Sequence, residues 1–245
     1  MSQRMKILIP MAGAGSRFEK CGYAVPKPLI PIKNMGNKPM VQVVVENINI
    51  DADYIFIVRE EHDKKYNLTQ FLKSVSPNCK IVKVNYLTEG AACTTLLAKK
   101  YIDNNHPLLI ANSDQFVEWN SGDFLQSISD ISTDGSILTF ENNDPNCSYV
   151  KLDGDGCVAE VREKQIISNE ATVGIYYWTR GCNYVKFAEQ MIQKNIRTNN
   201  EFYTAPTYNE AIEDKFKIKT FRINKVWSLG SPEDLNTFIE KYKKA

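Results

Sequence analysis

The sequence has little histidine and no paired cysteines, and both shortages narrow the chemistry open to it. Only two histidines occur, His62 and His106, and neither sits in a motif typical of a triad base or of a multi-histidine metal site. The absence of a CxxC pair argues against a zinc ribbon or a dithiol redox centre. Reduced and mostly packed thiols are therefore expected at Cys21, Cys79, Cys93, Cys147, Cys157 and Cys182.

An excess of charge and long hydrophobic runs are also absent. Lys and Arg number 30 against 29 for Asp and Glu, a formal net charge of +1, so no global field favours nucleic acid or an acidic membrane surface. Mean hydropathy is -0.36 and no apolar run approaches the roughly eighteen residues of a transmembrane helix. The apolar stretch at the N-terminus is too short for a signal peptide, which predicts a cytoplasmic protein.

Short strand-like runs alternate with longer helix-like segments over the first half of the chain, a pattern typical of βαβ units. Parallel strands with crossover helices predict an open doubly wound sheet that binds ligands at the carboxyl ends of its strands. Strands are expected at Lys6–Pro10, Tyr54–Val58, Lys80–Tyr86 and Leu108–Ala111, and helices at Pro39–Ile48, Glu60–Ser74 and Ala91–Ile102.

After Asp114 the pattern predicts mixed or antiparallel strands with a few helices. No linker, repeat or low-complexity segment divides the chain, so one domain over residues 1–245 is expected. The expected strands are Ser136–Glu141, Tyr149–Leu152, Val158–Arg162, Val173–Trp178 and Lys217–Ile223, and the expected helices are Cys182–Lys194, Glu201–Glu213 and Pro232–Tyr242.

A turn of small residues follows the first predicted strand and is the strongest local signal for function. Its backbone N–H groups could approach a phosphate closely. Phe18 replaces the third glycine of a GxGxxG motif, and the Gly-Lys-Ser/Thr ending of a Walker A loop is missing. An ordinary tight β-to-α turn is the alternative. The candidate nucleotide-binding residues here are Met11, Ala12, Gly13, Ala14, Gly15 and Ser16.

A proline-rich segment, Pro26–Pro31, restricts the backbone around Lys27 and so helps to fix where this lysine points. Lys27 offers a compact positive charge near a reacting phosphorus, and Arg17 can hold a polyphosphate bidentately. The alternative is a surface loop with a solvated lysine.

Together the two segments resemble the signature of the sugar-phosphate nucleotidylyltransferases and their cytidylyltransferase relatives, roughly GxGxR followed by PKPL. The similarity continues in Leu87–Ala92, which resembles the family's base-recognising segment, and in Asp114, which resembles its metal-binding aspartate at a strand end. The Glu163-Lys164 pair and the strand Thr172–Tyr176 resemble the family's substrate side. The resemblance implies an α/β fold: a single-domain, Rossmann-like three-layer sandwich of the GT-A type with a central mixed, mainly parallel sheet.

The resemblance also implies a role for each of these positions, although single residues leave alternatives open. Thr88 could simply cap a helix, Asp114 could form an Asx turn, and Glu163-Lys164 could be a solvated strand edge. The implied catalytic residues are Arg17, Lys27 and Lys164, with Asp114 as the Mg2+ ligand. Besides residues 11–16, the implied nucleotide contacts are Glu89, Gly90, Ala91 and Ser113, and the implied acceptor contacts are Glu163, Gly174 and Tyr176.

Two departures from the family pattern concern the metal and the acceptor. Many relatives carry a second acidic ligand in a Trp-x-Asp-x-Gly segment, whereas Trp227–Gly230 contains no aspartate, so the second metal ligand is unassigned. Gln165 follows the Glu-Lys pair where hexose-phosphate enzymes commonly have proline, and Glu201–Tyr203 replaces other motifs. Both differences argue against an ordinary glucose 1-phosphate acceptor.

The expected reaction is transfer of a nucleotidyl group from a nucleoside triphosphate to a small phosphorylated acceptor, with pyrophosphate released. A phosphate monoester has its second pKa near about 6, so the attacking oxygen is already ionised and no general base is required. The short chain resembles the CTP:phosphoglutamine cytidylyltransferase type of capsule gene clusters, so CTP is favoured. Neither nucleic acid nor a membrane is an expected partner, and a homo-oligomer is possible.

Three alternatives are kept. The first is a UTP- or dTTP-dependent sugar 1-phosphate nucleotidylyltransferase. The second is a GT-A glycosyltransferase, although Asp114-Gln115-Phe116 lacks the second aspartate of an Asp-x-Asp motif. The third is a non-catalytic sensor of nucleotide sugars, against which the presence of both Arg17 and Lys27 argues. Core or rim positions are expected for the tryptophans Trp119, Trp178 and Trp227.

Overall fold

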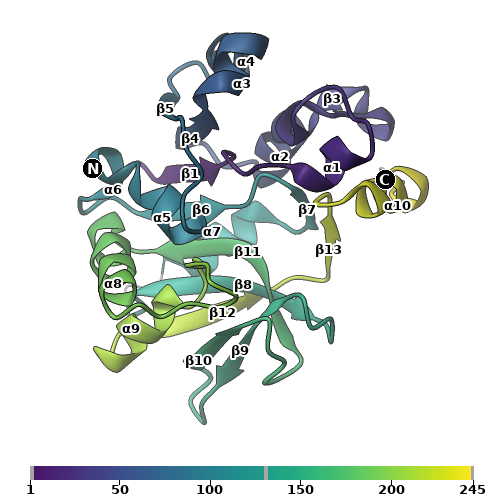
Figure 1. Ribbon diagram of the computed structural model, residues 1–245. Coiled ribbons are helices and arrows are strands. Elements are labelled where there is room, and N and C mark those ends of the chain that lie inside the picture. Colours follow the sequence, from purple (N-terminus) through teal and green to yellow (C-terminus); the bar gives the residue numbers. More distant parts are fainter. Residues whose placement is uncertain (1–2, 130–131, 244–245) are drawn as a thin grey trace.

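A mixed sheet forms the centre of the computed structural model, which describes residues 3–129 and 132–243 (Figure 1). This nine-stranded sheet runs in the order β10-β9-β11-β6-β1-β4-β5, and in addition β8 pairs with β11 and β12 pairs with β8. Parallel pairings connect β5 (Lys80–Val84), β4 (Asp53–Arg59), β1 (Lys6–Pro10) and β6 (Leu108–Ala111). Strand β11 (Glu170–Trp178) pairs antiparallel with β6 and begins the other half of the sheet.

The second half contains β8 (Gly135–Glu141), β9 (Ser148–Leu152), β10 (Val158–Glu163) and β12 (Ile218–Arg222). Two small ribbons lie outside the sheet, β2 (Pro31–Ile32) with β3 (Lys38–Pro39) and β7 (Gln115–Glu118) with β13 (Lys225–Ser228). The helices are α1 (Ser16–Lys20), α2 (Met40–Ile48), α3 (Glu60–Tyr66), α4 (Leu68–Val75), α5 (Ala91–Leu96), α6 (Lys99–Ile102), α7 (Ser121–Ser127), α8 (Gly181–Gln193), α9 (Thr207–Glu213) and α10 (Pro232–Lys241), with the 3-10 turns η1 (Lys27–Leu29) and η2 (Lys33–Met35).

The alternation of side chains along β1 shows why the molecule has three layers. Ile7 and Ile9 belong to the apolar cluster that includes buried residues of α2, α4 and α7. Leu8 points to the opposite face, into the cluster formed with α6, α8 and α9. The predicted α/β class with a mixed central sheet is therefore confirmed. The expected core or rim positions of the tryptophans are also confirmed, since Trp178 is fully buried, Trp227 is buried and Trp119 is partly buried.

Three predicted helices are wrong in extent. The helix predicted over 60–74 is two helices, because Asn67 adopts a left-handed conformation (φ 52°) between α3 and α4. The helix predicted over 91–102 is interrupted at Leu97 and Ala98, between α5 and α6. The helix predicted over 201–213 begins only at Thr207, because the backbone of Phe202 is hydrogen-bonded to residues near α5 instead.

The remaining sequence expectations that the described residues address concern thiols and membrane spans. All six cysteines are free, and all except Cys21 are buried or partly buried. Within residues 3–129 and 132–243, no helix combines the length and the apolar composition needed to cross a bilayer.

Candidate functional site

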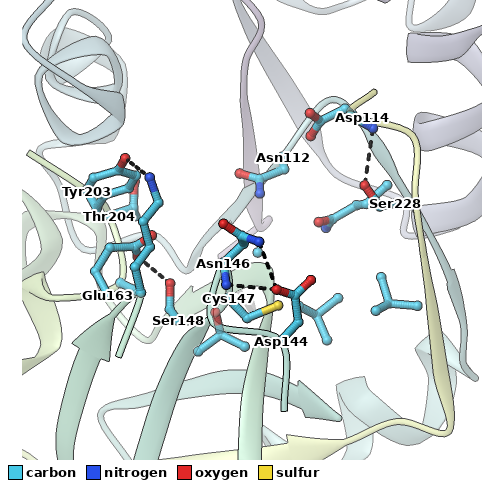
Figure 2. A pocket seen from close by; sticks show the side chains of 18 of the residues that line it. Asn112, Asp114, Asp144, Asn146, Cys147, Ser148, Glu163, Tyr203, Thr204 and Ser228 are labelled. Carbon is cyan, nitrogen blue, oxygen red and sulfur yellow. Dashed lines mark hydrogen bonds between the residues drawn. The ribbon is translucent and has the colours of Figure 1, made fainter. Parts of the chain in front are cut away.

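Two cavities open near the carboxyl ends of β1 and β6 and share Asn112 and Asp114 as a common wall. We call the cavity of about 520 Å³ the loop-side cavity, since the end of β1 and the loop after it, residues 10–14, line it together with Lys27. We call the cavity of about 830 Å³ the sheet-side cavity, since residues of β11 and the end of β10 line it. Figure 2 shows Asn112 and Asp114 above the opening of the sheet-side cavity. This edge of the sheet is where an α/β fold is expected to bind ligands.

The loop after β1 and the proline-rich segment pack against each other. Met11 donates its backbone N–H to Ile57 (2.9 Å), which ties the start of the loop to the sheet. Gly15 takes a left-handed conformation (φ 65°) at the start of α1, and an added Cβ there would lie 3.6 Å from Lys27 Cβ. Pro26 and the turn η1 then fix the direction of Lys27. The geometry thus places Lys27 beside the loop of small residues after β1, which is the candidate phosphate-binding segment.

Lys27 reaches the wall between the cavities. Its Nζ donates to Asp114 Oδ2 at 2.7 Å, and the two side chains are 20% and 24% exposed. The Asp114 carbonyl accepts the N–H of Leu229 (2.8 Å), which holds the segment after β13 against the end of β6. A Cβ on Gly230 would lie 3.1 Å from Asp114 Oδ2 and 3.9 Å from an Arg17 guanidinium nitrogen. Arg17, Lys27 and Asp114 therefore converge from three separate segments.

Gly90, which lines the loop-side cavity, lies in close contact with the backbone of Phe202. Its φ is 132°, and a Cβ there would lie only 2.4 Å from the Phe202 carbonyl oxygen. Gly90 and Ala91 line the cavity, as does Ser113. The Glu89 side chain is 66% exposed and forms an ion pair with Arg197 at 2.5 Å. Of the predicted nucleotide contacts in this segment, the structure thus brings Gly90 and Ala91 to the cavity, while Glu89 faces Arg197.

The Glu163-Lys164 pair lies at the end of β10 on the sheet-side cavity. Ser148 Oγ donates to the Glu163 carboxylate, and burial raises the pKa of Glu163. Lys164 adopts a left-handed conformation (φ 54°) and donates to the Tyr203 hydroxyl at 2.7 Å, a hydrogen bond that raises the pKa of Lys164. Tyr176 is buried behind them, and burial raises the pKa of its hydroxyl.

Two amide side chains in the cavity walls were missed by the sequence reasoning. Gly174 (φ 87°) leaves room for them, because a Cβ there would lie 2.2 Å from Asn112 Nδ2 and 2.7 Å from Gln115 Oε1. Gln115 is 7% exposed, and its Nε2 has no hydrogen-bond partner. The available signal was position: both are polar residues within two positions of Asp114, between the end of β6 and the start of β7. Asp144, Tyr203 and Asp234, which also line the sheet-side cavity, carried no motif.

The oxygen donors at the shared wall suit a hard divalent cation that takes its remaining ligands from water and from a bound phosphorylated substrate. Within the described parts of the chain, no group of three or more His, Cys, Asp or Glu side chains could form an all-protein metal cage. Asp114 supplies a carboxylate, and Asp234, which accepts a hydrogen bond from Ser228 Oγ (2.8 Å), lines the same cavity. Mg2+ commonly binds through one or two carboxylates, several waters and substrate phosphates. The donor set therefore fits Mg2+ bound together with a phosphorylated ligand.

Comparison with known proteins identifies relatives of this chain. The family described as Nucleotidyl transferase matches residues 6–245. The bifunctional protein GlmU of Methanocaldococcus jannaschii is 26% identical over 234 residues, which cover 94% of this chain and 52% of that protein. The chain thus spans about half the length of the curated relatives it matches.

Solved structures share the fold along the whole chain. The nucleoside-diphosphate-sugar pyrophosphorylase of Vibrio cholerae superposes with a TM-score of 0.80 at 25% identity, over 96% of this chain and 100% of that one. A UDP-glucose pyrophosphorylase complexed with UDP-glucose gives a TM-score of 0.74 at 18% identity, over 99% of this chain and 100% of that one. The second likeness, at this identity, concerns the fold alone.

Proposed function

Because the chain belongs to the nucleotidyl transferase family, we propose that it transfers a nucleotidyl group from a nucleoside triphosphate to a small phosphorylated acceptor, with Mg2+ as cofactor and pyrophosphate as the second product. The observation that carries the proposal is the meeting of the two cavities at Asn112 and Asp114, with Lys27 bound to Asp114. A nucleotide in the loop-side cavity and an acceptor in the sheet-side cavity would bring their reacting phosphates to that wall.

The mechanism follows from charge and position. An oxygen of the acceptor phosphate attacks the α-phosphorus, the new P–O bond forms there, and pyrophosphate leaves with the electron pair of the broken bond. No proton has to be removed, since the acceptor phosphate is ionised near neutral pH. Lys27 from the loop-side cavity and Arg17 from the sheet-side cavity neutralise the triphosphate at the shared wall, and Lys164 holds the acceptor phosphate. Mg2+ at Asp114 would offset charge between the two phosphates.

Cytosine is the favoured base. Glu201 lines the loop-side cavity with Gly90 and Ala91. A carboxylate accepts a hydrogen bond from the exocyclic amino group of cytosine, as glutamate and aspartate do toward cytosine N4 in nucleic acids. Uracil and thymine carry a carbonyl at this position, so two hydrogen-bond acceptors, the carbonyl oxygen and the Glu201 carboxylate, would face each other. Glu201 thus supports transfer of CMP.

The sheet-side cavity favours an acceptor that carries an amino group besides its phosphate. Asp144, Glu163 and Asp234 line this cavity, in addition to Asp114 at its wall. Carboxylates suit a cationic group on the acceptor, which a hexose 1-phosphate lacks. We therefore propose a phosphoglutamine-like acceptor, of the kind used in capsule or surface-polysaccharide formation.

A second candidate is activation of a sugar 1-phosphate with UTP or dTTP. The name of one similar structure, a nucleoside-diphosphate-sugar pyrophosphorylase, favours this candidate. It keeps the same reaction and the same catalytic residues and changes only the base and the acceptor.

One matrix of pyrophosphate-release assays tests both candidates. CTP, UTP, dTTP, ATP and GTP are each combined with phosphoglutamine, phosphocholine, aminoethylphosphonate and several sugar 1-phosphates, with and without Mg2+. We expect release from CTP with an amino-bearing phosphate, and only when Mg2+ is present. Pyrophosphate release from UTP or dTTP with a sugar 1-phosphate would establish the second candidate. The absence of pyrophosphate release in every combination would contradict the proposed function.

Replacing Gly174 by alanine is expected to lower turnover at least about tenfold. The added methyl group would push the Asn112 amide out of the shared wall, because the two would lie 2.2 Å apart. The left-handed φ of 87° adds about 1–2 kcal/mol of backbone strain. Gly156→Ala is the matched control, since Gly156 is also left-handed (φ 75°) but has nothing within 4 Å of an added Cβ. Urea unfolding should show the cost of the left-handed backbone in both variants and a further cost of the contact with Asn112 only in Gly174→Ala. Equal turnover in both would show that the Asn112 position is not used.

A further inference from the structure

Lys164 is held by Tyr203, a residue that takes no direct part in the proposed reaction. Its Nζ donates to Tyr203 Oη at 2.7 Å and lies 4.8 Å from the centre of the Tyr203 ring. The backbone N–H of Lys164 is bonded to the Cys147 carbonyl (3.0 Å), which fixes the chain at the end of β10. Glu163 and Glu201 are the other charged groups close to this ammonium. The Tyr203 hydroxyl thus selects one position for a long, flexible side chain.

Tyr203 ends a loop, residues 195–203, that is folded around Arg197. The Arg197 guanidinium lies 3.9 Å from the centre of the Phe202 ring and donates to Asn195 Oδ1 (2.7 Å) and to the Asn200 carbonyl (3.1 Å). Asn195 and Asn200 both have left-handed backbones, with φ of 54° and 63°. We call this segment the Arg197 loop. Its own contacts give it a defined shape, and this shape sets the location of Tyr203.

The Arg197 loop is also attached to the segment that lines the loop-side cavity. Phe202 donates its N–H to the Glu89 carbonyl (2.8 Å) and accepts the N–H of Ala92 (2.9 Å). Arg197 pairs with the Glu89 carboxylate at 2.5 Å. Gly90 permits this approach, since any side chain there would collide with the Phe202 backbone. One loop therefore contacts both the candidate base-binding segment and the lysine of the sheet-side cavity.

We propose that Tyr203 is a positioning residue that holds the Lys164 ammonium where the acceptor phosphate binds; this inference rests on the proposed function. The Arg197 loop links the position of Tyr203 to the nucleotide-binding segment. Tyr203 then acts through Lys164 and makes no contact with the reacting atoms. Its loss weakens acceptor binding and leaves the chemical step largely intact.

The kinetic test uses Tyr203→Phe, which keeps the ring and removes the hydroxyl. We expect the KM for the acceptor to rise about tenfold, as for loss of a hydrogen bond to a charged group, with kcat and the KM for the nucleotide within about twofold. In a Lys164→Met background, Tyr203→Phe should change the acceptor KM no further. An equal rise in both backgrounds would show a structural role for Tyr203 that is independent of Lys164 and would overturn the proposal.

Arg197→Ala tests the link through the loop. Arg197 lines neither cavity, yet its removal should raise the acceptor KM in the same direction as Tyr203→Phe and to a smaller extent. Arg162→Ala is the matched control, since Arg162 is an exposed residue of β10 two positions before Lys164 and pairs only with partly buried Glu160 among the described residues (2.6 Å). An unchanged acceptor KM in Arg197→Ala would overturn the loop part of the proposal.

A measurement that does not depend on activity separates this inference from the proposed function. The lysines are reductively 13C-methylated, and the Lys164 NMR signal is assigned by its loss in Lys164→Arg. The hydrogen bond to Tyr203 raises the pKa of Lys164 in the folded protein, so Tyr203→Phe and Arg197→Ala should lower it. An unchanged Lys164 pKa in Tyr203→Phe would overturn the positioning role. Absence of pyrophosphate release from the wild-type protein would instead count against the function alone.

Discussion

Lys27→Ala should lower turnover by about two to three orders of magnitude, with folding largely preserved. The Lys27 ammonium lies 2.7 Å from Asp114 Oδ2 at the wall between the two cavities, and its side chain is only 20% exposed. A fixed charge that faces developing charge in a partly desolvated site contributes roughly 3–4 kcal/mol to transition-state stabilisation, which corresponds to this factor. Pyrophosphate release at saturating nucleotide and acceptor measures the effect, and urea unfolding checks the fold.

Lys33→Ala provides the matched control for this variant. Lys33 lies six residues further along the same part of the chain, is exposed and lines neither cavity. Its replacement should leave turnover unchanged, whereas Lys27→Arg should recover part of the loss, since the charge returns with a different shape. A Lys27→Ala protein with nearly wild-type kcat would contradict the mechanism, because Lys27 supplies the ammonium that pairs with Asp114 at the wall where the phosphates are proposed to react.

The nine strands of the main sheet are easier to predict from sequence than the helices, whereas the ribbons β2–β3 and β7–β13 were not predicted. Strands β1 and β6 match their predicted bounds, since each is a short buried apolar run that a proline precedes or ends. The helix predicted over 60–74 fails at Asn67, whose left-handed backbone the helical periodicity of the neighbouring residues does not reveal. Local pattern thus finds apolar runs but misses a single left-handed residue that ends one helix and starts the next.

The candidate site likewise has parts that local sequence predicts and parts that depend on long-range contacts. The small-residue loop, Lys27 and the strand-end position of Asp114 could be predicted from local sequence. The contact between Lys27 and Asp114, 87 residues apart, is a product of the fold. Tyr203 was assigned to a helix from its sequence context, whereas backbone hydrogen bonds to Glu89 and Ala92 hold its neighbour Phe202 in an extended loop. No periodicity encodes such a long-range contact.

Asp114→Asn is expected to reduce turnover at least about a hundredfold and to raise the Mg2+ concentration needed for half-maximal rate. The substitution keeps the size of the side chain but removes the carboxylate charge, and a neutral amide is a much weaker ligand for Mg2+ than a carboxylate. It also leaves the Lys27 ammonium without its anionic partner at 2.7 Å, so the two effects combine at one position. Mg2+ titrations of pyrophosphate release separate them, since only the loss of metal affinity is relieved by added Mg2+.

The matched control is Asp214→Asn, which removes a carboxylate from another lysine pair. Asp214 accepts from Lys186 at 2.6 Å, but the two side chains are 44% and 49% exposed and lie outside both cavities. An exposed pair contributes about 0–1 kcal/mol, so this variant should unfold near the wild-type urea midpoint and turn over normally. If Asp114→Asn showed the wild-type Mg2+ dependence and lost activity, the carboxylate would act only by orienting Lys27. Arg17, Lys27 and Lys164 would then carry the charge stabilisation without a metal at Asp114.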